Sequence, residues 1–198
     1  VAELVFTHIF SLVRSTQITN RVMPSEGDSR FKELKKMASK GTEVAGKTIG
    51  ILGFGRIGQE AARIAIGLGM KVMVYDYKER SFDLELDLHP DYATHNFKVS
   101  LKGHKLEDVL SESDFITLHT PLTDSTRNII SADALNKTKK GVRIINCARG
   151  GLVDELALYA ALTSGHVAGA ALDVFSEEPA KENILFDHPN VIATPHLG

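Results

Sequence analysis

The sequence has a single cysteine, Cys147, among 198 residues, and it has no tryptophan. One cysteine excludes a disulfide within the chain and is typical of a reducing compartment. The sequence also has no large excess of one charge, since it contains 23 Lys and Arg and 25 Asp and Glu. This balance does not indicate nucleic acid or an anionic membrane as a partner. No apolar run is long enough to span a bilayer, and no signal-peptide pattern opens the sequence. We therefore expect a cytoplasmic protein.

The two ends of the sequence are unusual. It begins at Val1, without a methionine and directly in a helical pattern, and it stops at Gly198 directly after a strand-like stretch. We therefore expect it to be part of a longer protein. The length and the 43% hydrophobic content suit one domain with a full hydrophobic core.

The first 46 residues differ from the rest of the chain. Apolar residues near helical spacing predict a helix over residues 1–20. Residues 21–46 are mostly polar and predict a solvated connector. Its basic residues suggest an anion site as an alternative, although a solvated surface is the favoured interpretation. These basic residues are Arg30, Lys32, Lys35, Lys36 and Lys40.

From residue 47 onward, apolar strands alternate with helical patterns. Strands are expected at 48–52, 71–76, 114–118, 142–146, 167–172 and 191–194, and helices at 59–68, 106–113, 131–136 and 154–164. Ser131 and Asp154 are candidate N-caps. Near-continuous apolar strands are typical of a parallel sheet that helices cover on both faces. The pattern over 47–198 therefore predicts an α/β domain with a doubly wound, Rossmann-type parallel sheet.

Residues 77–105 interrupt this alternation with a polar segment. The alternating residues 82–88 predict a short ribbon within it. His89, Asp91 and His95 are potential metal ligands, but their spacing matches no known site. We therefore expect a surface loop and no metal.

A glycine pattern follows the first predicted strand and opens a helix. Gly53 permits a tight turn, Gly55 lets the backbone approach a pyrophosphate, and Gly58 allows the helix to pack closely on the strand. The helix N-terminus would offer N–H groups to the phosphates. Asp76 ends the next strand, where a carboxylate can bind ribose hydroxyls and repel the 2′-phosphate of NADP. The pattern therefore predicts NAD, although the nearby cations Lys78 and Arg80 weaken this preference.

Three later segments, 146–155, 171–179 and 194–198, lie at or near the carboxyl ends of predicted strands, where ligands bind to open α/β sheets. Arg149 suits two-point binding of a carboxylate, and the neighbouring Gly150-Gly151 suggests close backbone approach to a ligand. His196 can transfer a proton near neutral pH. Glu177 or Glu178 can orient its ring. These groups indicate hydride transfer between NAD and a 2-hydroxy or 2-keto acid.

These motifs are similar to those of the D-isomer-specific 2-hydroxyacid dehydrogenases over nearly the whole chain. The matching segments are the glycine pattern, Gly69-Met70, Tyr75-Asp76, 119–122, 146–155, 171–179 and Pro195-His196. The late motifs most resemble those of members that act on D-3-phosphoglycerate. The sequence departs from the family pattern at residues 77–105, where members usually have a shorter connection. This difference puts the adenine edge of the pocket in question.

The resemblance implies a role for each matching residue. It makes Arg149 the carboxylate clamp, His196 the acid and base, and Glu178 rather than Glu177 the partner of His196. The implied NAD contacts are Arg56 and Ile57 at the pyrophosphate, Thr120 and Pro121 at the adenine side, Cys147 and Ala148 at the nicotinamide ribose, and Asp173 at the nicotinamide end. Cys147 is expected to be a small buried residue rather than a nucleophile.

The resemblance also implies a companion substrate lobe that this sequence lacks, so we expect little activity from this domain alone. Residues 1–20 would form the inter-lobe or dimer helix of a homodimer or larger homo-oligomer. Hydroxypyruvate and glyoxylate reduction are alternative activities. A non-enzymatic, NAD-sensing corepressor is a further alternative, since such proteins share the fold and the three catalytic residue types.

Overall fold

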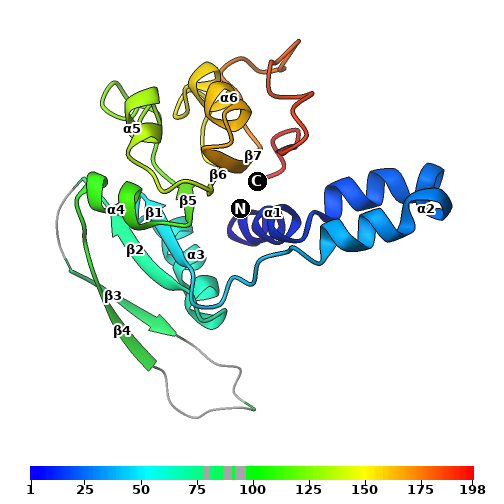
Figure 1. Cartoon of the computed structure of the whole chain (residues 1–198). Coiled ribbons are helices and arrows are strands. Elements are labelled where there is room, and N and C mark those ends of the chain that lie inside the picture. Colours follow the sequence, from blue (N-terminus) through cyan, green and yellow to red (C-terminus); the bar gives the residue numbers. More distant parts are fainter. Residues whose placement is uncertain (78–80, 87–90, 92–96) are drawn as a thin grey trace.

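A six-stranded parallel sheet forms the centre of the molecule in a computed structural model that describes residues 1–77, 81–86, 91 and 97–198. Its order is β2-β1-β5-β6-β7-β8 (Figure 1). The strands are β1 Thr48–Leu52, β2 Lys71–Tyr75, β5 Phe115–Leu118, β6 Val142–Asn146, β7 Val167–Leu172 and β8 Val191–Ala193. The direction of succession reverses between β1 and β5, which is where ligands bind in such sheets. The predicted doubly wound parallel sheet is confirmed.

Helices cover both faces of the sheet because successive strand side chains point to opposite sides. On one face, α3 (Arg56–Gly67) packs against β1 and α1 (Ala2–Arg14) packs against β6 and β7, in an apolar core that includes the alternate β1 residues Ile49 and Ile51. On the other face, α4 (Leu106–Glu112), α5 (Ala132–Asn136) and α6 (Glu155–Thr163) form a second apolar core that includes Leu52. The sheet is therefore held rigidly between two layers.

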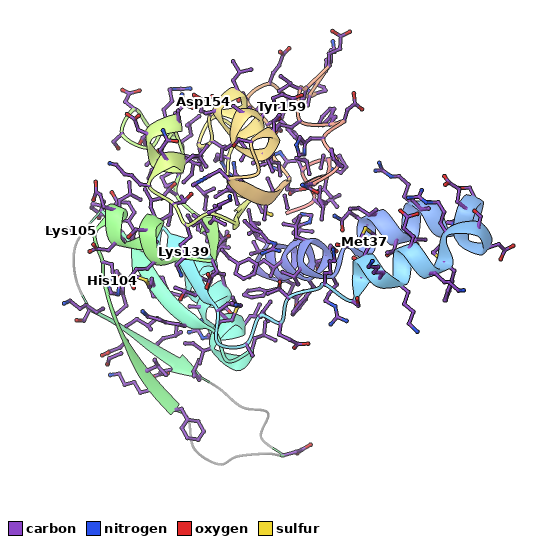
Figure 2. The ribbon with its side chains drawn as sticks, viewed as in Figure 1. Met37, His104, Lys105, Lys139, Asp154 and Tyr159 are labelled. Carbon is purple, nitrogen blue, oxygen red and sulfur yellow. The ribbon has the colours of Figure 1, made fainter. Side chains whose placement is uncertain are left out.

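The two predicted helix caps are present. The Ser131 hydroxyl accepts a hydrogen bond from the backbone N–H of Ala134 at the start of α5. Asp154, labelled in Figure 2, lies at the N-terminal end of α6, and its carboxylate accepts from the N–H of Ala157 at 3.0 Å. These caps fix where the two helices begin after the loops that leave the sheet.

The N-terminal region differs from the sequence-based expectation. The helix predicted over 1–20 is divided at Ser15, which has a φ of 53°, and the supposed connector contains α2 (Thr16–Ala38). The α2 segment projects away from the sheet (Figure 1). It has little apolar periodicity, but Arg30 pairs with Glu26 and Glu33 at 3.0 and 2.7 Å along its surface. Ion pairs at this spacing stabilise an exposed helix slightly.

The segment that interrupts the α/β alternation contains the predicted ribbon. Strands β3 (Ser81–Leu86) and β4 (Phe97–Lys102) pair in antiparallel fashion. Phe82 and Leu84 are buried, and the ring of Phe82 lies 4.7 Å from that of Phe54, so the ribbon packs against the main core. The prediction of a ribbon is confirmed.

Two other expectations concern residues in or near this segment. His89 and His95, and the cations Lys78 and Arg80, lie outside the described residues. Within the described ranges, no group of three potential ligands is arranged around a metal position.

No described helix combines the length and the apolar character needed to cross a membrane.

Candidate active site and nucleotide-binding edge

The turn after β1 is shaped by close backbone contacts. Gly53 has a φ of +97°, and a β-carbon built there would lie 2.8 Å from the carbonyl carbon of His119. A β-carbon on Gly58 would overlap the carbonyl of Gly53, so this glycine lets α3 start close to the strand. No atom of the described residues, apart from its chain neighbours, lies within 4 Å of a β-carbon at Gly55. The protein itself therefore requires Gly53 and Gly58, while Gly55 borders open space.

Helix α3 begins at Arg56, directly after Gly55, which is three residues earlier than the sequence suggested. Its first two residues, Arg56 and Ile57, are exposed. The first turn of a helix has backbone N–H groups without helical partners and carries positive dipole. The open space at Gly55 therefore faces a surface that is suited to a phosphate group.

Asp76 holds the glycine turn from the neighbouring strand. It follows β2 directly, and its Oδ2 accepts a hydrogen bond from the backbone N–H of Phe54 at 2.9 Å. Its Oδ1 is buried and has no hydrogen-bond partner among the described residues. A buried carboxylate oxygen is costly to leave unpaired, so this atom fits a ligand hydroxyl.

The residues after β5 lie opposite the glycine turn. Thr120 packs its methyl group near Gly53, and its hydroxyl is a second buried oxygen without a described partner. Pro121 follows and is exposed. His119 is half-buried, its Nε2 lies 3.0 Å from the Thr117 hydroxyl, and desolvation of its ring lowers its pKa to about 4. His119 is therefore neutral at physiological pH, and two orphaned oxygens face the point where the strand order reverses.

Asn146, the last residue of β6, shapes the loop that carries Arg149. Its side-chain amide donates to the Arg149 carbonyl at 2.9 Å, and its Oδ1 accepts from the Ala148 N–H at 3.1 Å. The Arg149 side chain is exposed, with one guanidinium nitrogen donating to the Ala148 carbonyl. Sequence reasoning assigned Asn146 no role, although an asparagine directly before a glycine-rich loop is a signal for side-chain bonds to the backbone.

Cys147 and Ala148 connect β6 to Arg149. Cys147 is 5% exposed, and burial, with a smaller effect of the Asp173 charge, raises the pKa of its thiol to about 12. A thiol with this pKa carries almost no thiolate at neutral pH and is a poor nucleophile. Ala148 is half-buried beside it.

Gly150 makes a close approach to the protein's own backbone. A β-carbon on Gly150 would overlap the backbone carbonyl of Phe175, so the segment before Glu178 lies directly against the loop of Arg149. Glu155 adds a second connection, because its Oε1 accepts from both the N–H and the hydroxyl of Ser176 at 2.8 Å. The loop of Arg149 is thereby joined to the segment that leads to Glu178.

Glu178 and His196 form an ion pair or hydrogen bond at the edge of the sheet. Glu178 Oε2 lies 2.7 Å from His196 Nδ1, and its Oε1 accepts from the Phe175 N–H at 3.0 Å. The hydrogen bond to His196 is the main cause that lowers the pKa of Glu178, and the bond from the Phe175 N–H adds to it. Glu177 is exposed and makes no such contact. The structure thus brings together Glu178 and His196, as the family resemblance implied.

Asp173 lies beneath the turn that carries His196. It is fully buried, and its carboxylate accepts from the Thr194 hydroxyl at 2.6 Å and from the N–H groups of Leu197 and Gly198, each at 2.8 Å. Its backbone carbonyl accepts from the His196 N–H at 2.9 Å. Burial alone would raise the pKa of Asp173, but these hydrogen bonds outweigh it and lower the pKa. The residue expected at the nicotinamide end is here a support for the His196 turn.

A cavity of about 480 Å³ opens beside the Glu178–His196 pair. Its wall is mostly apolar and includes Phe175, Phe186 and Pro195. This volume is within the range of small-molecule sites. Glu178 and His196 therefore line a space that can hold a small organic molecule.

Comparison with known families agrees with this geometry. Residues 6–198 match the family model described as D-isomer specific 2-hydroxyacid dehydrogenase, NAD binding domain. The match covers nearly the whole chain, and the chain therefore belongs to this family.

Individual relatives are similar over most or all of the chain. D-3-phosphoglycerate dehydrogenase of Bacillus subtilis is 46% identical over 200 residues, which is 100% of this chain and 34% of that protein. Hydroxypyruvate reductase of Thermotoga maritima is 46% identical over 83% of this chain and 50% of its own length. The crystal structure of NAD-dependent formate dehydrogenase from Staphylococcus aureus in complex with NAD matches with a TM-score of 0.81 at 30% identity, over 98% of this chain and 54% of that one. The chain thus spans between a third and about half of the length of these proteins.

Proposed function

We propose that this chain is the NAD-binding part of an enzyme that transfers a hydride between NAD and a D-2-hydroxy acid. The observation that carries the proposal is the 2.7 Å contact between Glu178 Oε2 and His196 Nδ1 at the nucleotide-binding edge. The preferred substrate is D-3-phosphoglycerate. This preference rests on the late sequence motifs and on the relatives named D-3-phosphoglycerate dehydrogenase.

The residues at the nucleotide-binding edge fit NAD. The open space at Gly55 and the first turn of α3, with Arg56 and Ile57, suit the pyrophosphate. The orphaned Oδ1 of Asp76 suits a ribose hydroxyl. Thr120 and Pro121 would line the adenine side. Cys147 and Ala148 would lie at the nicotinamide ribose, with Asp173 beneath the nicotinamide end.

His196 would move the substrate proton. Its Nδ1 faces Glu178, which leaves Nε2 for the substrate oxygen. During reduction of a keto acid, His196 would donate a proton from Nε2, and during oxidation the neutral ring would accept the hydroxyl proton there. Glu178 would stabilise the charged ring and fix its orientation. NAD, when bound, supplies or accepts the hydride.

Arg149 would hold the substrate carboxylate. It is exposed on a loop that Asn146 braces and that Gly150 joins to the segment before Glu178. A guanidinium can bind a carboxylate through two parallel hydrogen bonds, which would orient the neighbouring carbon for hydride transfer. Binding and proton transfer would then occur on two joined loops.

The remaining parts of the enzyme would lie outside this chain. We propose a second lobe that closes the substrate cleft, with α1 at the contact between lobes or between two copies of a homo-oligomer. The domain alone would turn over substrate weakly or not at all. Groups that recognise a substrate phosphate would lie mainly on that second lobe or on a neighbouring subunit.

A substrate panel on an enzyme that contains this chain with a substrate lobe tests the proposal. We expect oxidation of D-3-phosphoglycerate with NAD to exceed oxidation of glycerate. The reverse order would favour a hydroxypyruvate reductase, the activity named for the Thermotoga maritima relative. Arg149→Ala should reduce kcat/KM for every 2-hydroxy acid by about 100-fold or more, equivalent to about 3 kcal/mol.

Two control variants sharpen this test. Arg149→Lys keeps the charge but loses the planar fork, so we expect an intermediate activity. Arg21→Ala, at an exposed position on α2, should leave turnover unchanged. An Arg149→Ala enzyme with near-normal activity would show that the carboxylate clamp has been assigned to the wrong residue.

A further inference from the structure

His8 is a buried histidine that the proposed chemistry does not use. It lies on α1, is 3% exposed, and is surrounded by the apolar residues that pack this helix on the sheet. Its Nε2 lies 3.3 Å from the hydroxyl of Thr194, which is 186 positions later in the sequence and two residues before His196. A polar contact between α1 and the His196 turn therefore crosses an otherwise apolar interface.

The hydrogen-bond donors in this contact can be assigned from chemistry. The Thr194 hydroxyl lies 2.6 Å from Asp173 Oδ1, and an ionised carboxylate only accepts, so the single hydroxyl hydrogen points to Asp173. The Thr194 oxygen must then accept from His8. Burial lowers the pKa of His8, although the Asp173 charge opposes this effect. We therefore expect a neutral His8 ring that carries its hydrogen on Nε2.

The chain of hydrogen bonds continues from Asp173 to the His196 turn. Asp173 accepts from the N–H groups of Leu197 and Gly198 on either side of its carboxylate. The turn holds His196 at a φ of +57°, a left-handed conformation that is unfavourable for a residue other than glycine. The bonds to Asp173 are the contacts that stabilise this conformation, in which Nδ1 of His196 meets Glu178.

We propose that His8 is a positioning residue that fixes the His196 turn from α1 by way of Thr194 and Asp173. The catalytic part of this inference rests on the proposed role of His196 as acid and base. The positional part does not, because it concerns bonds within the chain. The alternative is that His8 only fills space in the core.

Two variants of His8 separate positioning from packing. His8→Leu has a similar volume and removes the donor, while His8→Gln can present an amide N–H near the position of Nε2. The readout is the pKa of the Glu178 carboxyl, measured by carbon-13 NMR of this chain. This pKa reports on the turn because the contact with His196 is the largest cause that lowers it. We expect His8→Leu to raise this pKa toward the ordinary value of a glutamate, and His8→Gln to leave it near the wild-type value.

The imidazole nitrogens give a second, direct readout. Nitrogen-15 NMR of the wild-type chain should show His8 neutral at pH 7 with its hydrogen on Nε2. A hydrogen on Nδ1, or a Glu178 titration that is unchanged in a folded His8→Leu chain, would overturn the proposal. If His8→Leu does not fold, the variants Thr194→Val and Thr194→Ser replace the two His8 variants. The proposal then requires that Thr194→Val raises the Glu178 pKa and that Thr194→Ser does not.

Activity measurements extend the test to the whole enzyme. His8→Leu should lower kcat about tenfold while the KM for NAD stays within twofold, and His8→Gln should restore most of kcat. Equal activities of the three enzymes, despite the expected NMR differences, would overturn the catalytic part. An enzyme that oxidises no 2-hydroxy acid would instead contradict the proposed function and leave the NMR result standing.

Discussion

Gly150 lies so close to Phe175 that a β-carbon at position 150 would overlap the Phe175 carbonyl. This contact joins the loop of Arg149 to the segment that presents Glu178, two groups that come from different strands. The site is therefore braced by the backbone of its own loops. The close approach that glycine permits here organises the protein and would act on the substrate only indirectly.

We expect Gly150→Ala to force these loops apart. Overlap with a backbone carbonyl cannot be relieved by a side-chain rotation, so the cost should be about 1–3 kcal/mol. Thermal unfolding should show a Tm lower by several degrees. Gly67→Ala is the matched control, because no described atom beyond the backbone of its own helix lies within 4 Å of a β-carbon there, and the variant should gain up to about 1 kcal/mol. Equal melting of wild type and Gly150→Ala would refute the bracing role.

Gly55→Ala should separate nucleotide binding from folding. Its φ of −73° and ψ of −167° are allowed for alanine, and among the described residues no atom beyond its chain neighbours lies within 4 Å of the new methyl group. The Tm should therefore change little. NAD affinity should fall by about tenfold or more, because the methyl group would occupy space that the pyrophosphate needs. Calorimetric titration of the folded variant checks this, and undiminished affinity would place the pyrophosphate elsewhere.

Asp173→Asn should destabilise the chain at neutral pH and less so in acid. The folded pKa of Asp173 is lowered, so its stabilising contribution is complete above the unfolded value of about 3.9 and is lost as the pH falls through the folded value. The variant should lose about 1–3 kcal/mol at pH 7, since an amide nitrogen would face hydrogen-bond donors. Urea unfolding at pH 7 and pH 3 measures both differences. If the difference in unfolding free energy between wild type and Asp173→Asn is the same at both pH values, the stabilising role of the ionised Asp173 carboxylate is contradicted.

Cys147 should resist thiol reagents in the folded chain. Burial raises its pKa to about 12 and limits access to the sulfur. Reaction with a disulfide reagent at pH 8 should be at least about 100-fold slower than in urea. Labelling of the native chain as fast as that of the unfolded chain would mean that the β6 loop opens readily.

The doubly wound sheet was accessible from the sequence because buried strands and capped helices leave strong local signals. Ser131 and Asp154 each precede a helical pattern and form the predicted caps. Helix α2 was missed because its support comes from charge pairs such as Arg30–Glu33 and not from an apolar stripe. A search for apolar periodicity cannot detect a helix of this kind.

The candidate site was only partly accessible from the sequence. Glu178 could be selected over Glu177 by family resemblance, but no local pattern contains the 2.7 Å contact with His196. The support given by Glu155 and His8 depends on contacts between segments that are distant along the chain. Such contacts arise only when the strands are arranged in the sheet, so the sequence of one loop does not reveal them.

Titration of this chain with NAD and with NADP tests the central claim most directly, because the two nucleotides differ by one phosphate on the ribose that Asp76 would bind. NAD should bind at least about tenfold more tightly. Asp76→Asn retains an oxygen for the Phe54 N–H and removes the negative charge, so it should reduce this preference. Tighter binding of NADP, or a preference that Asp76→Asn leaves intact, would contradict the account.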